Sequence, residues 1–201
     1  MRDLFDIFAR QFEKPQGLLG KLAGKIMYFE NRKINRWTIE QLQINRRDSI
    51  LEVGFGPGYS IKHIMDQWRY SETDGVDVSE DMRTAAAKLN DDYIQQGKVR
   101  LFVKDVHDYF PDKRYNKIFS VNNYPLWRKP RESLQHLHGM LEKDGKIAIT
   151  VQPREEGVDE TITKNLGQVI KADMEAAGFH SISISFKEAR PVLTVCVTGI
   201  K

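Results

Sequence analysis

A run of apolar strand residues that leads directly into a glycine-rich turn and then a helical pattern is the feature that most constrains the fold. It is ILEVGFGPGY at residues 50–59, followed by SIKHIMDQW. Gly54, Gly56 and Gly58 accept a positive φ and let a ligand approach the backbone closely. A helix beginning near Tyr59 presents unpaired N–H groups, which favour an anionic part of a ligand. The segment predicts a ligand-binding turn between a buried strand and a helix.

After residue 48 the chain alternates between short apolar, β-branched runs and helical patterns. The runs are SILEVGF, TDGVDVS, KVRLFVKD, NKIFSVN and GKIAITVQ, and the helical stretches between them include EDMRTAAAKLNDDYIQQ and RESLQHLHGMLEKD. This order predicts βαβ units and a mainly parallel sheet with helices on both faces. Near the end, SISISF and VLTVCVTGI form a pattern typical of a hairpin. We therefore expect an α/β, Rossmann-like fold with seven strands and an antiparallel C-terminal strand.

The composition fits a soluble domain. Hydrophobic residues make up 40% and charged residues 29% of the chain, which is ordinary for a globular protein and too polar for a membrane span. The first residues, MRDLFDIFARQFEK, have no uninterrupted apolar core, so we expect a cytoplasmic protein. Cys196 is the only cysteine, which excludes an internal disulfide and a cysteine-based metal site. No other metal-ligand spacing occurs, and we expect no bound metal.

Residues 1–47 have a different pattern, with apolar residues at three- and four-residue spacing that predict amphipathic helices. They carry ten Lys/Arg and five Asp/Glu, whereas the whole chain has a net charge of only +3. The basic excess fits either a solvated helix face or attraction of an anionic substrate or surface. We expect a helical lid at 1–47 over a cofactor-binding domain at 48–201. Transient contact with a membrane surface is compatible with this pattern, but a nucleic-acid partner is not favoured.

Two acidic residues follow the next two expected strands. Asp77 ends the second strand in GVDVSEDM, nineteen residues after Gly58. A carboxylate at about this distance is where a Rossmann-like site meets ribose hydroxyls, because it accepts hydrogen bonds from both. Ser79 also fits a helix N-cap, and an alternative is that Asp77 only supports that cap. Asp105 follows the third strand, where the alternative is a plain turn residue.

The glycine-rich segment resembles motif I of class I S-adenosylmethionine-dependent methyltransferases, in which an acid and one variable residue precede G-x-G-x-G. Glu52 is the acid here. A nicotinamide-dependent oxidoreductase is the rival enzyme, but Tyr59 stands where its third glycine belongs. The resemblance covers residues 49–152 and extends to the quinone-biosynthesis C-methyltransferases. It implies S-adenosylmethionine as cofactor and a small-molecule or lipid-like methyl acceptor. A cofactor-binding regulator without turnover remains the non-enzyme alternative.

The resemblance also implies roles for individual residues. It assigns the ribose to Asp77, the adenine ring to Val78, Met82, Asp105 and Val106, and the methionine portion to Asn122. Glu52 and the three loop glycines complete the expected cofactor-binding residues. Tyr124 and Trp127 are then expected near the acceptor, and the lid hypothesis adds Tyr28, Asn31 and Asn35.

No catalytic base stands out in the sequence. Tyr28, Tyr59, His107 and Tyr124 are candidate bases or orienting groups. The segment Asn122-Asn123-Tyr124-Pro125 departs from the N-P-P-Y signature of amino-group nucleic-acid methylation. The set of acidic residues that binds the metal ion in catechol methyltransferases is also missing. Nucleic-acid amino groups and catechols are therefore both disfavoured as acceptors.

Overall fold

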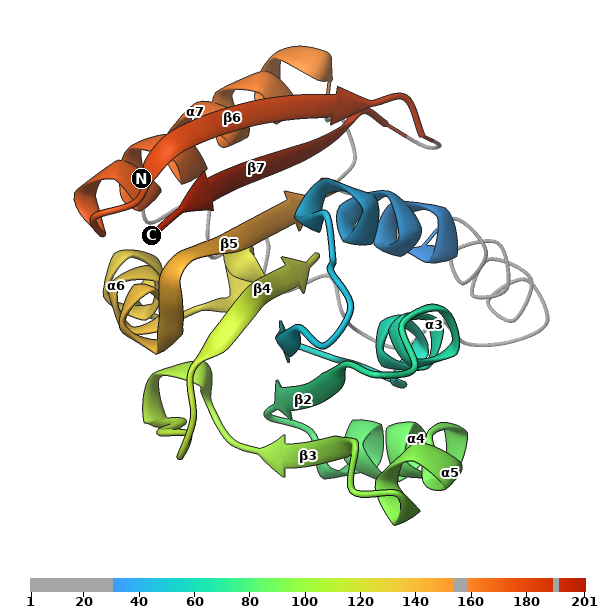
Figure 1. The fold of residues 1–201 in the computed structure, drawn as a ribbon. Helices are drawn as coiled ribbons and strands as arrows, with labels where there is room; N and C mark the ends of the chain where they lie inside the picture. The colour runs from blue at the N-terminus through green and yellow to red at the C-terminus, as the bar shows by residue number, and fades with distance from the viewer. Residues whose placement is uncertain (1–30, 154–158, 190–191) are drawn as a thin grey trace, which may run out of the picture.

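The computed structural model describes residues 31–153, 159–189 and 192–201, and Figure 1 shows their arrangement. The helices expected within residues 1–30, and Tyr28 with them, lie outside the described residues. The described part forms one sheet with helices on both faces. The predicted α/β, Rossmann-like architecture is confirmed.

The sheet has seven strands in the order β3-β2-β1-β4-β5-β7-β6. Their bounds are β1 (Ser49–Val53), β2 (Glu72–Asp77), β3 (Val99–Val103), β4 (Tyr115–Val121), β5 (Leu141–Val151), β6 (His180–Lys187) and β7 (Thr194–Ile200). Strands β1 to β5 pair in parallel, whereas β7 pairs antiparallel with both β5 and β6. The predicted antiparallel C-terminal strand is therefore present. It lies inside the sheet and is buried on nearly every residue, while β6 forms the edge.

Helices cover the two faces in separate groups (Figure 1). One face carries the helix at residues 31–42 with α3 (Tyr59–Gln67), α4 (Glu80–Leu89) and α5 (Asp91–Gln95); the other carries α6 (Pro130–Met140) and α7 (Glu160–Ala176). Short 3-10 turns, η2 (Val106–Asp108) and η3 (Tyr124–Leu126), follow β3 and β4. In β1, Ile50 packs with Ile64 of α3, whereas its neighbour Leu51 belongs to the cluster on the opposite face. Burial on both faces explains the continuous apolar runs of the parallel strands.

One expected helix is broken at Asn90 into α4 and α5. The Asn90 side-chain amide donates hydrogen bonds to the carbonyl oxygens of Ala86, at 2.9 Å, and Gly58, at 3.1 Å. Asn90 is 1% exposed. The break therefore places a buried amide where it joins the end of α4 to the glycine-rich turn.

The helix expected over residues 131–144 ends earlier than its pattern indicates. Helix α6 stops at Met140, and β5 begins at Leu141, which pairs with Tyr115 of β4. The register between β4 and β5 then shifts before Lys146. Pairing with β4 decides this boundary, and the local sequence pattern holds no information about that pairing.

The helix at residues 31–42 is part of the hydrophobic core. Its buried apolar residues are Ile34, Trp37, Ile39 and Leu42. Three of them share a cluster with Ile64 of α3 and with strands β1, β4, β5 and β7. The hydroxyl of buried Thr38 also lies 2.7 Å from that of Thr150 in β5. Residues 31–42 thus pack against the sheet, and the lid expected at residues 1–47 stays a prediction.

Replacing Ile39 by alanine tests this shared core. Because Ile39 is 1% exposed, Ile39→Ala should lower the free energy of unfolding by about 2–5 kcal/mol, measured by urea denaturation. The neighbouring exposed residue of the same helix provides the control, and Glu40→Ala should change it by less than about 0.5 kcal/mol. Equal effects of the two substitutions would show that the helix does not share the core.

Candidate active site

The glycine-rich turn lies at the carboxyl end of β1, between β2 and β4. The sheet order reverses at this point, because β2 and β4 flank β1 on opposite sides. Ligands of open α/β sheets bind in the crevice outside the strand ends at such a switch point. The turn is joined to β2 by the hydrogen bond from the Gly54 N–H to the carbonyl oxygen of Val76, at 2.8 Å.

The three glycines of the turn all have positive φ, at +77° for Gly54, +50° for Gly56 and +81° for Gly58. A Cβ atom at Gly54 would collide with the side chain of Asn123. At Gly58 it would lie 2.7 Å from the side chains of Ala86 and Asn90. At Gly56 it would meet nothing within 4 Å. Two glycines are therefore required by packing, whereas Gly56 faces open space that a ligand can enter.

Asp77 connects the turn to the start of α4. One carboxylate oxygen accepts a hydrogen bond from the Gly56 N–H at 2.9 Å, and the other accepts from the Ser79 N–H at 3.0 Å. The Ser79 hydroxyl in turn accepts from the Met82 N–H at 3.3 Å, which caps α4. Asp77 therefore supports the cap, and its carboxylate retains lone pairs for further donors.

Glu52 lies buried under the turn, with 3% of its surface exposed. The pKa of Glu52 is raised well above its ordinary value, mainly because burial disfavours the charged form. The charge of Asp77 also raises this pKa, whereas a hydrogen bond with Ser60 partly offsets the rise. The Oε2 atom has no hydrogen-bond partner among the described residues. A buried carboxyl oxygen without a partner is costly, and a donor from a ligand would satisfy it.

The ends of β2 and β3 combine exposed apolar side chains with a carboxylate. Val78 is 70% exposed and Met82 is 37% exposed, although both are apolar. Asp105 is half-buried and accepts a hydrogen bond from the His107 N–H at 2.9 Å, which caps η2, while Val106 is buried. Exposed apolar side chains beside hydrogen-bonding groups are typical of a surface that covers a flat ring.

Asn122 organises the ends of β4 and β5. Its φ is +54°, and its side-chain oxygen accepts a hydrogen bond from the Gln152 N–H at 2.8 Å. Its side-chain nitrogen lies 3.4 Å from the side-chain oxygen of Asn31, on the helix at 31–42. These three amides join that helix to the carboxyl ends of two strands.

Tyr124 and Trp127, which the resemblance implies near the acceptor, are buried in the core. The Tyr124 hydroxyl donates to Asp173 of α7 at 2.7 Å, and burial, followed by this hydrogen bond, raises the pKa of Tyr124. Trp127 is 7% exposed and donates from its ring nitrogen to Asn123 at 2.6 Å. These contacts anchor η3 and favour a structural role for both residues over base catalysis by Tyr124.

The other candidates lie at different distances from the turn. Tyr59 follows it directly and packs under Arg32, whose guanidinium carbon is 4.4 Å from the ring centroid. His107 is exposed at the end of β3, with its ring 6.1 Å from that of His136. Asn35 is half-buried on the helix at 31–42. Tyr28 falls outside the described residues.

Asn90, Asn123 and Gln152 belong to the site but were not singled out from the sequence. The latter two follow β4 and β5 directly, so the rule that ligands bind beyond strand carboxyl ends was sufficient to find them. Asn90 gave no such signal, because it lies inside a helical pattern and reaches the turn only in the folded chain.

Two kinds of feature are absent from the part of the chain that the structure describes. No three or more His, Cys, Asp or Glu side chains are grouped closely enough there to hold a metal ion. Within the same ranges, no helix has the length and apolar character needed to cross a membrane.

The geometry agrees with the relatives that sequence and structure comparison identify. A family model described as a methyltransferase domain matches residues 50–145. The "Uncharacterized methyltransferase YdaC" of Bacillus subtilis (strain 168) is 41% identical over 181 residues, which cover 90% of this chain and 98% of that protein.

A further relative is more distant, and a solved structure is similar in fold. Malonyl-[acyl-carrier protein] O-methyltransferase 1 of Ilyobacter polytropus is 29% identical over 133 residues, covering 63% of this chain and 48% of that protein. The Haemonchus contortus phosphoethanolamine N-methyltransferase 2 in complex with phosphomonomethylethanolamine and S-adenosylhomocysteine has a TM-score of 0.66 at 13% identity. That match covers 83% of this chain and 52% of the solved one. The chain thus spans about half the length of each.

The buried carboxyl predicts a specific dependence of stability on pH. Because the folded-state pKa of Glu52 is raised, its contribution to stability is full below pH 4.5 and is lost as pH rises through the raised pKa. Glu52→Gln should remove this loss, so the free energy of unfolding of the variant relative to the parent should increase over that interval. Urea denaturation at a series of pH values measures the difference. Parallel curves for the two proteins would contradict the assignment.

Proposed function

We propose an acceptor class and a set of binding residues for this chain. It belongs to the methyltransferase domain family and is a class I S-adenosylmethionine-dependent methyltransferase. The acceptor that we propose is a small-molecule or lipid-like compound that enters the crevice beyond β4 and β5. The observation that carries the proposal is the open space at Gly56, whose N–H donates to the neighbouring carboxylate of Asp77.

The residues around the turn fit S-adenosylmethionine by their chemistry. Oε2 of Glu52, which has no partner among the described residues, suits the cationic amino group, and Asp77 suits the ribose hydroxyls. The exposed side chains of Val78 and Met82 suit the adenine ring. We further assign the adenine edge to Asp105 with the backbone of Val106, and the methionine end to the loop glycines with Asn122.

When bound, S-adenosylmethionine supplies a methyl group that its sulfonium charge activates for displacement. The contribution of this chain is to bind both reactants and to hold them in line. The Asn122 side chain bonds to Asn31 and accepts from the backbone N–H of Gln152, so it is held in place and can orient an acceptor without rearrangement. Amides do not accept a proton near neutral pH. We therefore propose alignment as the main catalytic effect, with Tyr59 and His107 as the remaining described candidates for a base.

The acceptor class is supported by the helix at residues 31–42, which contacts the end of β4 through Asn31 and so borders the crevice. Asn35 lies on the same helix and is half-buried. Tyr28 and the other residues 1–30 precede this helix directly in sequence, and we propose that they contribute to acceptor binding. The malonyl-[acyl-carrier protein] relative supports including carrier-bound carboxylates among the compounds tested.

Cofactor binding at the turn can be tested with two matched glycines. Gly56 and Gly97 both have positive φ, and a Cβ at either meets nothing within 4 Å, but Gly97 precedes β3 away from the turn. Each alanine variant should lose about 1 kcal/mol of stability through backbone strain. Only Gly56→Ala should weaken S-adenosylhomocysteine binding at least about tenfold, or about 1.4 kcal/mol, by calorimetry. Equal affinity in the two variants would contradict the assignment of the open space at Gly56 to the cofactor.

Acceptor transfer is tested by a screen that measures S-adenosylhomocysteine release from small carboxylates, malonyl thioesters, phenols and lipid headgroups. Deleting residues 1–30 should abolish turnover of whichever acceptor is found, because half of the proposed acceptor side is removed, while S-adenosylhomocysteine affinity persists. Circular dichroism and urea denaturation control for folding. Undiminished turnover would show that residues 1–30 are not needed, and methylation of RNA or DNA would overturn the acceptor class.

A further inference from the structure

The two glycines that flank Pro57 in the glycine-rich turn are held by the same neighbouring segment. The Gly56 N–H donates to the carboxylate of Asp77 at 2.9 Å. The Gly58 carbonyl oxygen accepts from the side-chain amide of Asn90 at 3.1 Å. Asp77 ends β2, and Asn90 follows the last residue of α4. The stretch from the end of β2 to the end of α4 therefore holds the turn at two points.

The approach of α4 to Gly58 is unusually close. A Cβ atom added at Gly58 would lie 2.7 Å from the Cβ atom of Ala86 and 2.9 Å from its Cα atom. The same added atom would lie 2.7 Å from the Nδ2 atom of Asn90. Ala86 and Asn90 are one helical turn apart, so they lie on one side of the helix end, and both are buried. This side of α4 packs directly on the last glycine of the turn.

The side-chain amide of Asn90 is satisfied on one side only. Its Nδ2 atom donates to the carbonyl oxygens of Ala86, at 2.9 Å, and Gly58, at 3.1 Å. Its Oδ1 atom is buried and has no hydrogen-bond partner in the described part of the chain. An unpaired buried oxygen lowers stability and offsets part of what the two bonds contribute. The feature that a shorter polar side chain could not supply is the bond to Gly58, 32 residues away in sequence.

The bond from Asn90 restrains a peptide group that joins the turn to α3. Glycine has access to many backbone conformations, so outside contacts are needed to keep Gly58 at its φ of +81°. One contact to its carbonyl oxygen comes from the Lys62 N–H, at 3.1 Å, which lies within α3. The other, from Asn90, ties the same oxygen to the end of α4. Loss of the Asn90 bond would therefore give this peptide group more freedom to rotate.

The restrained peptide group lies close in sequence to the space where a ligand can enter. Gly56, which faces that space, is two residues before Gly58 in the same turn. A turn that keeps one conformation loses less entropy when a ligand binds. Because Asn90 is 1% exposed, its effect on a ligand passes through Gly58 rather than through a contact of its own.

We propose that Asn90 is a positioning residue for cofactor binding: it holds the Gly58 carbonyl oxygen and so keeps the glycine-rich turn in the conformation that binds S-adenosylmethionine. The proposal rests on the proposed assignment of the cofactor to the space at Gly56, and it adds a residue that the cofactor does not touch. Asp77 holds the turn at Gly56, and Asn90 holds it at Gly58. Substitution of Asn90 should therefore weaken cofactor binding in a protein that stays folded.

The test compares Asn90→Ala with Asn90→Ser in the full chain. A serine hydroxyl can still donate to the carbonyl oxygen four residues earlier, that of Ala86, but it is too short to reach Gly58. Asn90→Ser should therefore keep more stability than Asn90→Ala in urea denaturation. Both should nevertheless weaken S-adenosylhomocysteine binding at least about fivefold by calorimetry. If the serine variant binds like the parent, Asn90 serves only to end the helix and the proposal is overturned.

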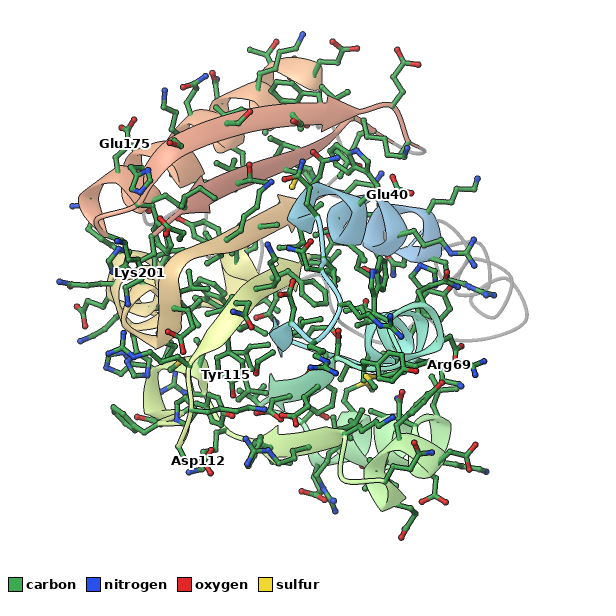
Figure 2. The ribbon with its side chains drawn as sticks, in the orientation of Figure 1. Glu40, Arg69, Asp112, Tyr115, Glu175 and Lys201 are labelled. Atoms are coloured by element: carbon green, nitrogen blue, oxygen red, sulfur yellow. The ribbon has the colours of Figure 1, made fainter. Side chains whose placement is uncertain are left out.

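Lys201 offers a matched control, because its side-chain nitrogen also ties a helix end to another segment. Its Nζ atom donates to the carbonyl oxygens of Leu141, at 2.7 Å, and Gly139, at 3.4 Å, beside α6 (Figure 2). Lys201→Met should leave the affinity for S-adenosylhomocysteine unchanged. Ile39→Ala controls for lost stability, because Ile39 and Ala86 belong to different hydrophobic clusters, and it should also bind like the parent. An equal loss of affinity in either control would refute a specific role of Asn90.

Hydrogen exchange follows the turn in the protein without ligand. The Gly56 N–H should exchange at least about fivefold faster in Asn90→Ser than in the parent, and Lys201→Met should keep the parent rate. An unchanged rate in Asn90→Ser would overturn the claim that Asn90 holds the turn.

Calorimetry of the parent separates this proposal from the proposed function. If the parent binds no S-adenosylhomocysteine, the cofactor assignment fails and the role of Asn90 fails with it. If the parent binds it and both Asn90 variants keep the parent affinity, the role of Asn90 alone is refuted.

Discussion

The hydrogen bond from the Gly56 N–H to the carboxylate of Asp77 fixes the element on which the rest of the site depends. It holds a turn of three glycines at positive φ between β1 and α3, and the same carboxylate accepts from the start of α4. Asn90 packs against Gly58 and Asn123 packs against Gly54, so neither glycine has room for a Cβ atom. These contacts hold the turn in one backbone conformation, and a turn that is already held loses less entropy when a ligand binds.

Beneath this turn lies a carboxyl group, that of Glu52, in an environment that disfavours its charge. Glu52 is buried, its raised pKa records the loss of solvation, and one oxygen has no partner within the described ranges. Such a group lowers stability in the free protein and gains a favourable contact when a cationic ligand arrives. Such groups are common at functional sites, because a ligand that binds there can supply the contact that the folded chain lacks.

The helix at residues 31–42 links the hydrophobic core to the end of β4, where we propose that the acceptor binds. It buries Trp37, Ile39 and Leu42 against the sheet. Its first residues instead reach Asn122, which follows β4, and Tyr59, which follows the glycine-rich turn. The position of Arg32 is therefore set by core packing as much as by its own contacts. A shift of this helix would change the acceptor side while the cofactor turn, held by Asp77, stayed in place.

The sequence by itself determined the strand–turn–helix unit, the alternating α/β pattern and the antiparallel C-terminal strand, because each of these is encoded by residues near one another in the chain. Tertiary structure decided which distant side chains meet. It brought Asn90 to Gly58, drew Tyr124 and Trp127 into the core, and inserted β7 between β5 and β6. Periodicity tells which face of an element is apolar, but it does not tell which partner covers that face. For the same reason, the apolar spacing of residues 31–42 does not by itself show that they pack against the sheet.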